Sequence, residues 1–177
     1  MGKNSKDLVT RGKQLAFLLR HDKEYKFDRH GWREVSDLIK NHGYTMSELT
    51  EIVDTNDKKR YEFDETKKRI RARQGHSVNV DVELKEVTPP DVLYHGTATR
   101  FLEGIYRDGI KSMTRLHVHL SDSIETAKKT GARHGTPVVL TIDAGRMSKD
   151  GVKFFRSENG VYLTKVVNRK YIIGETE

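Results

Sequence analysis

Apolar residues near the start of the chain recur at the spacing of an α-helix. The pattern consists of Leu8, Val9, Leu15, Leu18 and Leu19. It predicts a helix from residue 5 to about residue 21 with one apolar side, and Ser5 is suited to be its N-cap. The helix is expected to end in Arg20–His21, since cations at a helix C-terminus interact favourably with the helix dipole.

Two further helices are predicted downstream of Gly31–Trp32. The apolar side of the second helix consists of Val35, Leu38 and Ile39, and Gly43 is placed to end it. Thr45 and Glu48 have the spacing of a capping box, in which each side chain bonds the backbone of the other. The third helix then continues through Leu49, Ile52 and Val53. Trp32 is expected in the core rather than as a platform on which a base stacks.

A β-hairpin is expected after these helices. Tyr61 and Phe63 alternate with polar residues, residues 64–67 favour a turn, and alternation resumes over residues 69–73. Three short helices followed by a hairpin favour an α+β arrangement, with a winged-helix lobe at the N-terminus.

The second hairpin strand carries three arginines on one face. Arg69, Arg71 and Arg73 alternate with Ile70 and Ala72. Because neighbouring guanidiniums repel one another, a phosphate would stabilise the row, and arginine binds phosphate through two parallel hydrogen bonds. The following Gln-Gly-His-Ser segment is polar and rich in donors. The alternative interpretation is a solvated edge strand that arginine keeps soluble.

The character of the chain changes over residues 80–90, where Pro89–Pro90 stiffens a connector. We therefore predict two lobes, over residues 1–85 and 86–177. The second lobe is expected to mix strands and helices. Strands are predicted at 92–95, 117–121, 137–142, 154–155, 161–163 and 171–173. Helices are predicted around residues 101–106, which Gly109 ends, and at 123–130.

Composition narrows the class of protein. The 177 residues carry a net charge of +7, and residues 1–77 hold most of the excess, which favours a polyanionic partner for the first lobe. The absence of cysteine excludes disulfides, thiol catalysis and cysteine-ligated zinc. No apolar run approaches the length of a membrane span. We expect a soluble, cytoplasmic, monomeric protein.

The candidate chemistry lies in arginine and histidine. His95, His117 and His119 raise the question of a metal, but no acidic residue lies at ligand spacing, so none is expected. No Ser-His-Asp arrangement or pair of carboxylates stands out either. Arginine and histidine without a carboxylate base suit a reaction whose nucleophile is already an anion. Arginines would bind that anion and offset charge in the transition state.

Five motifs in this order resemble those of the RNA 2′-phosphotransferases, the KptA-type tRNA splicing enzymes. They are Leu-Leu-Arg-His ending at His21, Ile-Arg-Ala-x-Gln-Gly-His-Ser ending at Ser77, Leu-Tyr-His-Gly-Thr ending at Thr97, the segment from Arg115 to Ser121, and Gly-x-Arg-His-Gly ending at Gly135. The resemblance extends from about Leu15 to Tyr171. Arg73 departs mildly from the family pattern, where asparagine is common, and this change would only add affinity for RNA.

The resemblance implies a winged-helix RNA lobe and a C-terminal lobe with the ADP-ribosyltransferase fold. It implies NAD⁺-dependent removal of an internal RNA 2′-phosphate. The phosphate attacks C1″ of the nicotinamide ribose and expels nicotinamide, and O2″ then attacks the phosphorus. The products are 2′-OH RNA and ADP-ribose 1″,2″-cyclic phosphate.

The resemblance also assigns residues to roles. The implied catalytic residues are Arg20, His21, Arg71 and Arg133. The implied NAD⁺ contacts are His95, Gly96, Thr97, His119, Leu120 and Ser121. The implied RNA contacts are Arg69, Arg73, Gln74, His76 and Ser77. Val161 stands where many protein ADP-ribosyltransferases have a catalytic glutamate, in agreement with a nucleophile that needs no base.

Two other classes of protein remain open. One is a mono-ADP-ribosyltransferase that modifies another acceptor and would use a nearby carboxylate, for which Glu158 is the candidate. The other is a non-catalytic winged-helix protein that binds nucleic acid, in which the histidines of the second lobe are structural. The phosphotransferase is favoured, because a plain binding protein gives Arg20, His21, Arg71 and Arg133 no reason to coexist.

Overall fold

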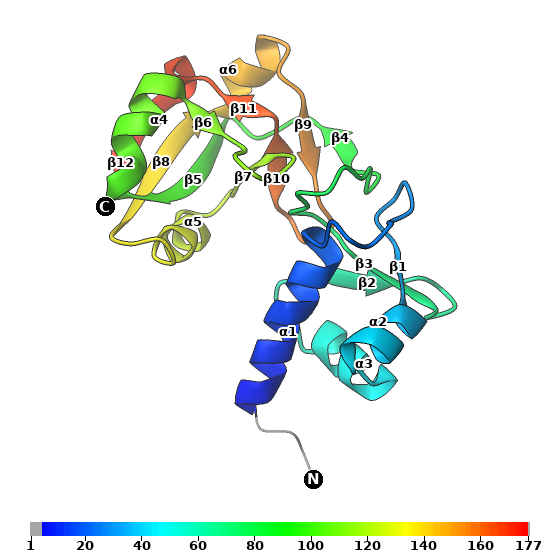
Figure 1. The fold of residues 1–177 in the computed structure, drawn as a ribbon. Coiled ribbons are helices and arrows are strands. Elements are labelled where there is room, and N and C mark those ends of the chain that lie inside the picture. Colours follow the sequence, from blue (N-terminus) through cyan, green and yellow to red (C-terminus); the bar gives the residue numbers. More distant parts are fainter. Residues whose placement is uncertain (1–4, 177) are drawn as a thin grey trace. The chain divides into compact units, whose positions relative to one another are not determined.

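The computed structural model describes residues 5–176, with side chains from residue 7 onward. Backbone contacts divide the chain into two compact units, Met1–Glu83 and Leu84–Glu177. Both combine helices with antiparallel sheets, which confirms the α+β class (Figure 1). No helix of the described residues has the length and apolar character that a membrane crossing requires.

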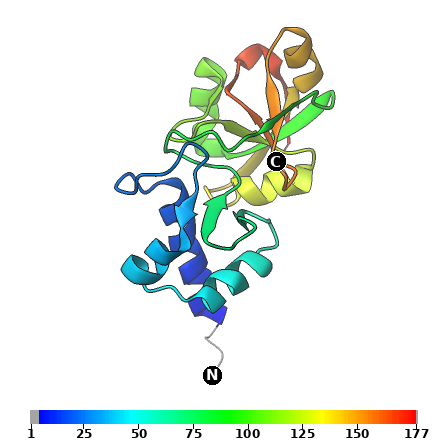
Figure 2. The same cartoon turned by 90° about the vertical axis from the view of Figure 1, so that its right-hand side faces the viewer.

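Unit 1 contains three helices and one small sheet. The helices are α1 (Ser5–Arg20), α2 (Val35–His42) and α3 (Met46–Asp54). The strands are β1 (Arg33–Glu34), β2 (Tyr61–Phe63) and β3 (Arg69–Ala72), in the order β1-β3-β2. The three helices and the β2–β3 hairpin are as predicted, and Figure 2 gives a second view of them. The two-residue strand β1 was not predicted.

Local signals in the sequence set the ends of two helices as predicted. Gly43 takes a left-handed conformation (φ 65°) after α2, which a residue with a side chain rarely adopts. Thr45 and Glu48 form the capping box at the start of α3.

The core of unit 1 corrects three sequence expectations. Leu15, Leu19 and Ile70 are fully buried, as expected from their patterns. Val9 and Ile39, predicted on apolar helix faces, are 60% and 42% exposed. Each directly follows a residue that faces the core, Leu8 and Leu38, and the helical rotation from one residue to the next turns its side chain toward solvent. Trp32 is only partly buried and lies outside the core cluster. The guanidinium carbons of Arg69 and Arg71 lie 5.5 and 4.4 Å from its ring centroid.

Unit 2 is built mainly of strands. They are β4 (Lys85–Val87), β5 (Val92–Ala98), β6 (Ile110–Lys111), β7 (Val118–Leu120), β8 (Pro137–Asp143), β9 (Phe154–Arg156), β10 (Tyr162–Thr164), β11 (Val166–Val167) and β12 (Ile172–Thr176). The helices are α4 (Leu102–Asp108), α5 (Ile124–Gly131) and α6 (Ala144–Lys149), and short 3₁₀ turns lie at Thr99–Phe101 and Arg169–Tyr171. Of these strands and α-helices, β4, β6, β11 and α6 were not predicted.

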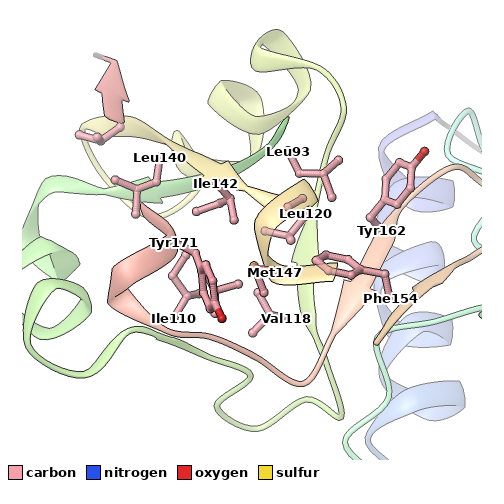
Figure 3. Packing of buried hydrophobic residues seen from close by; sticks show 13 residues of the cluster. Leu93, Ile110, Val118, Leu120, Leu140, Ile142, Met147, Phe154, Tyr162 and Tyr171 are labelled. Carbon is pink, nitrogen blue, oxygen red and sulfur yellow. The ribbon is translucent and has the colours of Figure 1, made fainter. Parts of the chain in front are cut away.

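Two sheets of unit 2 are joined at one point. Their strand orders are β4-β9-β10-β7 and β12-β8-β5, and β11 pairs with β6 separately. The backbones of Tyr94 and Ser121 exchange two hydrogen bonds of 2.7 and 2.9 Å, which link β5 to the residue after β7. Figure 3 shows side chains from both sheets in one core, among them Leu140 and Ile142 of β8, Leu120 of β7 and Phe154 of β9.

Candidate functional site

The C-terminal end of α1 is tied to the segment that follows β3. The carbonyl oxygen of Arg20 accepts hydrogen bonds from the backbone N–H groups of Ser77 and Val78, at 3.0 and 3.3 Å. Nδ1 of His21 lies 2.9 Å from Oγ of Ser77. Gly75 has a φ of 86°, and a side chain added there would meet the Arg20 guanidinium at 3.5 Å. Two of the five sequence motifs therefore meet in unit 1.

The arginines of β3 do not form an uncompensated row, which corrects the sequence expectation. Arg69 contacts Asp64 at 3.2 Å and Asp28 at 3.5 Å. The two carboxylate oxygens of Glu62 hold Arg71 at 2.6 Å and Arg73 at 3.4 Å. The repulsion between guanidiniums is thus offset by carboxylates of the same unit. A phosphate would have to compete with these carboxylates.

The Arg71 guanidinium is held by several partners. Its Nε donates to Glu62, and its Nη1 donates to the carbonyl of His30 at 3.3 Å and to Glu83 at 3.2 Å. Nη2 has no hydrogen-bond partner among the described residues. Glu83 is 58% exposed, so its carboxylate is the partner that an incoming anion displaces most readily.

Two of the expected RNA contacts are buried. Gln74 and His76 are 7% and 2% exposed, and neither Gln74 Oε1 nor His76 Nε2 has a hydrogen-bond partner among the residues that the structure describes. Burial, together with the charges of Arg20, His21 and Arg71, lowers the pKa of His76 to about 3. His76 is therefore neutral at physiological pH.

In unit 2, Gly96 and Gly131 allow α5 to lie directly against β5. A side chain at Gly96 would lie 1.7 Å from the carbonyl oxygen of Ala127, and one at Gly131 would lie 2.3 Å from that of Thr97. Thr97 and Leu120 are buried as well. The other four of the six expected NAD⁺ contacts, His95, Gly96, His119 and Ser121, are partly exposed.

His95 is held in one tautomer. Its Nδ1 lies 3.1 Å from the carbonyl oxygen of His119, which can only accept, so Nδ1 carries the proton. Burial lowers the pKa of His95, and His134 adds to this effect, although the bond to the carbonyl opposes it. In the resulting neutral ring, Nε2 is a hydrogen-bond acceptor. Ser121 accepts a bond from the Ser123 backbone at 3.0 Å.

Arg115 and Arg133 approach each other from different segments. Arg115 precedes β7 and Arg133 follows α5. Ser121, which follows β7, pairs antiparallel with Tyr94 of β5, and Gly131 at the end of α5 lies against Thr97 of the same strand. Neither guanidinium has a carboxylate partner in the described part of the chain.

The pKa of the Arg115 guanidinium is lowered by desolvation and by the charge of Arg133. A guanidinium pair without a carboxylate is suited to an anion. Arg115 lies in one of the five sequence motifs, but the sequence alone predicts no role for it.

The remaining histidines of unit 2 do not assemble a metal site. His117 and His119 flank Val118 on one face of β7, as expected, and the ring of His117 packs edge-on against Phe155 at 5.9 Å. His134 packs similarly against Phe101 at 6.5 Å. Within residues 5–176, no three histidine, aspartate or glutamate side chains are grouped so that they could hold a metal ion.

Comparison with known proteins identifies the family. Residues 6–166 match the model of the RNA 2′-phosphotransferase, Tpt1 / KptA family. A probable RNA 2′-phosphotransferase of Flavobacterium johnsoniae is 46% identical over 168 residues, which are 90% of this chain and 92% of that protein. One of Acaryochloris marina is 48% identical over 91% of this chain and 93% of its own. One of Pseudomonas savastanoi is 46% identical, with coverages of 96% and 94%. The chain belongs to the RNA 2′-phosphotransferase family.

Proposed function

We propose that this protein removes an internal 2′-phosphate from RNA and consumes NAD⁺ in doing so. The 2′-phosphate attacks C1″ of the nicotinamide ribose, the C1″–N bond breaks and nicotinamide leaves. O2″ then attacks the phosphorus, and the bond to the RNA 2′-oxygen breaks. The products are nicotinamide, 2′-OH RNA and ADP-ribose 1″,2″-cyclic phosphate. NAD⁺ is a substrate of this reaction rather than a resident cofactor.

The contact between the motif that ends at His21 and the motif that ends at Ser77 is the observation that best supports this proposal. His21 and Ser77 are 56 residues apart in the sequence, yet their side chains are in hydrogen-bond contact beside Arg20. A guanidinium next to an oriented imidazole supplies a positive charge and a proton donor at one place. Those are the two groups that the breaking bond between phosphorus and the RNA 2′-oxygen requires.

The roles of the arginines follow from the charge of the reacting groups. Arg71 and Arg133 bind the 2′-phosphate and fix its attacking oxygen. Arg20 offsets the charge that grows at phosphorus in the second step. His21 protonates the RNA 2′-oxygen as it leaves, which an imidazole can do near neutral pH. No base is needed in the first step, because the phosphate is already an anion.

The donor set of unit 2 fits NAD⁺. The Nε2 lone pair of His95 suits a ribose hydroxyl, and Ser121 and His119 lie on the neighbouring segment. In the same unit, the guanidiniums of Arg115 and Arg133 suit the 2′-phosphate that attacks NAD⁺. On this basis we propose that unit 2 has the ADP-ribosyltransferase fold and that unit 1, with its three helices and hairpin, is a winged-helix lobe that binds RNA.

The experiment that tests the function uses an RNA with a single internal 2′-phosphate. The protein should release nicotinamide and dephosphorylate this RNA only when NAD⁺ is present. If nicotinamide is released while the 2′-phosphate remains and another acceptor is labelled, the protein is a mono-ADP-ribosyltransferase. If the RNA is bound and neither product forms, the protein is a nucleic-acid-binding protein. Either result would overturn the proposal.

A further inference from the structure

Arg33 is a buried charge that the proposed reaction does not use. It begins β1, and its side chain is 2% exposed. Nη1 donates hydrogen bonds to the carbonyl oxygen of Leu18 at 2.9 Å and to Oδ2 of Asp22 at 2.7 Å. Asp22 directly follows His21, and Leu18 lies two residues before Arg20.

The rest of the Arg33 guanidinium is anchored to α2 and to a neighbouring ring. Nε donates to Asp37 at 2.7 Å, Nη2 lies 2.8 Å from Nε2 of His42, and the guanidinium carbon lies 4.1 Å from the Tyr25 ring centroid. The guanidinium therefore has contacts on all its sides and cannot turn without losing several of them. It connects α2 rigidly to the end of α1.

The positive charge of Arg33 is balanced by two neighbouring carboxylates, those of Asp22 and Asp37. Burial alone would raise the pKa of the Asp22 carboxyl, but hydrogen bonds from Arg33 and from the Glu24 backbone hold it below its ordinary value. The pKa of Asp37 is likewise lowered, by bonds from Asn41 and Arg33 that outweigh its burial. Both carboxylates are ionised at neutral pH, so the contacts are charge-assisted hydrogen bonds.

A contribution to stability alone does not account for this arrangement. Well-packed apolar residues often replace a buried ion pair without loss of stability, so such a pair is weak grounds for a purely structural role. The carbonyl of Leu18 belongs to the last turn of α1, whose acceptors have no partner within the helix. A guanidinium bonded there fixes the direction in which the chain leaves α1.

We propose that Arg33 is a positioning residue that holds Arg20 and His21 in their reactive orientation by fixing the chain on both sides of them. The inference rests on the proposed function and deepens it, since it names a residue on which the second step depends. Arg33 itself touches neither RNA nor NAD⁺.

The test compares Arg33→Gln with Arg11→Gln. Arg11 is a matched control, because its guanidinium also bonds a carboxylate, Glu48 at 3.0 Å, and a backbone carbonyl, Gly43 at 3.0 Å, and covers the ring of Tyr44. It has no contact with residues 18–22 in the described structure. Arg33→Gln should lower kcat by about 10- to 100-fold, as displacements near 1 Å do, and accumulate ADP-ribosylated RNA, with KM for both substrates changed less than about threefold. Arg11→Gln should do neither.

A double-mutant cycle separates positioning from general damage. In a His21→Ala background, Arg33→Gln should slow the reaction by a clearly smaller factor than it does in the wild-type protein, because the part of its effect that passes through His21 is already lost. A full multiplicative loss would overturn the proposal. If Arg33→Gln fails to fold, Asp22→Asn removes one link of the same network and should give a smaller effect of the same kind, about three- to tenfold. An Asp22→Asn variant with full second-step activity would also overturn it.

A spectroscopic readout keeps this inference distinct from the proposed function. The imidazole resonances of His21, assigned with the His21→Ala variant, should shift in Arg33→Gln and not in Arg11→Gln. If the wild-type protein lacks activity while these resonances shift as expected, the proposed function fails and the positioning stands. If the resonances do not move, Arg33 does not position His21.

Discussion

The hydroxyl of Ser77 lies 2.9 Å from Nδ1 of His21, and the Ser77 backbone N–H donates to the carbonyl of Arg20. Ser77 thus holds both members of the Arg20–His21 pair. A hydroxyl can accept from a protonated Nδ1 or donate to a neutral one, so it supports the imidazole in both protonation states. Ser77 is also one of the predicted RNA contacts, and in the structure its hydroxyl lies against His21.

Ser77→Ala should slow the second step by about tenfold, because a loosely held imidazole loses part of its advantage as a general acid. Affinity for RNA should stay within about twofold of wild type. Quenched time courses that resolve ADP-ribosylated RNA from product check this, with the exposed Ser36→Ala on α2 as the control. Weaker RNA binding with a normal second step would return Ser77 to the RNA-binding role.

Glu83→Gln should tighten the binding of 2′-phosphorylated RNA. Glu83 pairs with Nη1 of Arg71, the group that we assign to the phosphate, and an exposed ion pair is worth about 0.2–1 kcal/mol. Its removal should lower the apparent Kd by up to about fivefold. The measurement is a titration with matched RNAs that have and lack the 2′-phosphate. An equal gain for both RNAs would mean that Arg71 does not contact that phosphate.

The two glutamates that pair with Arg71 are contacts that the sequence does not predict. Capping residues, the turn of the hairpin and the alternation over residues 69–72 are short-range patterns, and the structure confirms the elements that they predict. Glu62 faces Arg71 only because of the register of the hairpin, and Glu83 approaches from a separate segment. No local pattern signals such partners. The burial of Arg33 and the exposure of Ile39 have the same origin, since both depend on which element packs where.

Arg115→Ala should raise KM for 2′-phosphorylated RNA by about 10-fold or more, because a charge-assisted hydrogen bond is worth about 1.5–3 kcal/mol. Arg115 has no carboxylate partner in the described structure and lies near Arg133, so it is suited to share the phosphate that Arg133 binds. Arg107→Ala is the control, since Arg107 pairs with Asp108. If both variants behave alike, the Arg115–Arg133 pair binds no phosphate.

His76 should make the protein less stable in acid. Its pKa is about 3 in the fold against an ordinary value of 6.5, so the unfolded chain takes up a proton as the pH falls below 6.5 while the folded chain does not. The free energy of unfolding should decrease by about 2 kcal/mol between about pH 7.5 and pH 5 on this account, and level off near pH 3. The free energy of unfolding, measured by denaturant titration at several pH values, should fall less steeply with decreasing pH in His76→Gln than in the wild-type protein. An equal slope would place His76 in contact with solvent.

The fate of the phosphorus atom tests the central claim most directly. An RNA labelled with ³²P at its internal 2′-phosphate is incubated with the protein and NAD⁺, and the small products are separated. We expect the label to appear in ADP-ribose 1″,2″-cyclic phosphate, with one nicotinamide released for each phosphate removed. Label in inorganic phosphate, without release of nicotinamide, would show a simple phosphatase and contradict the account.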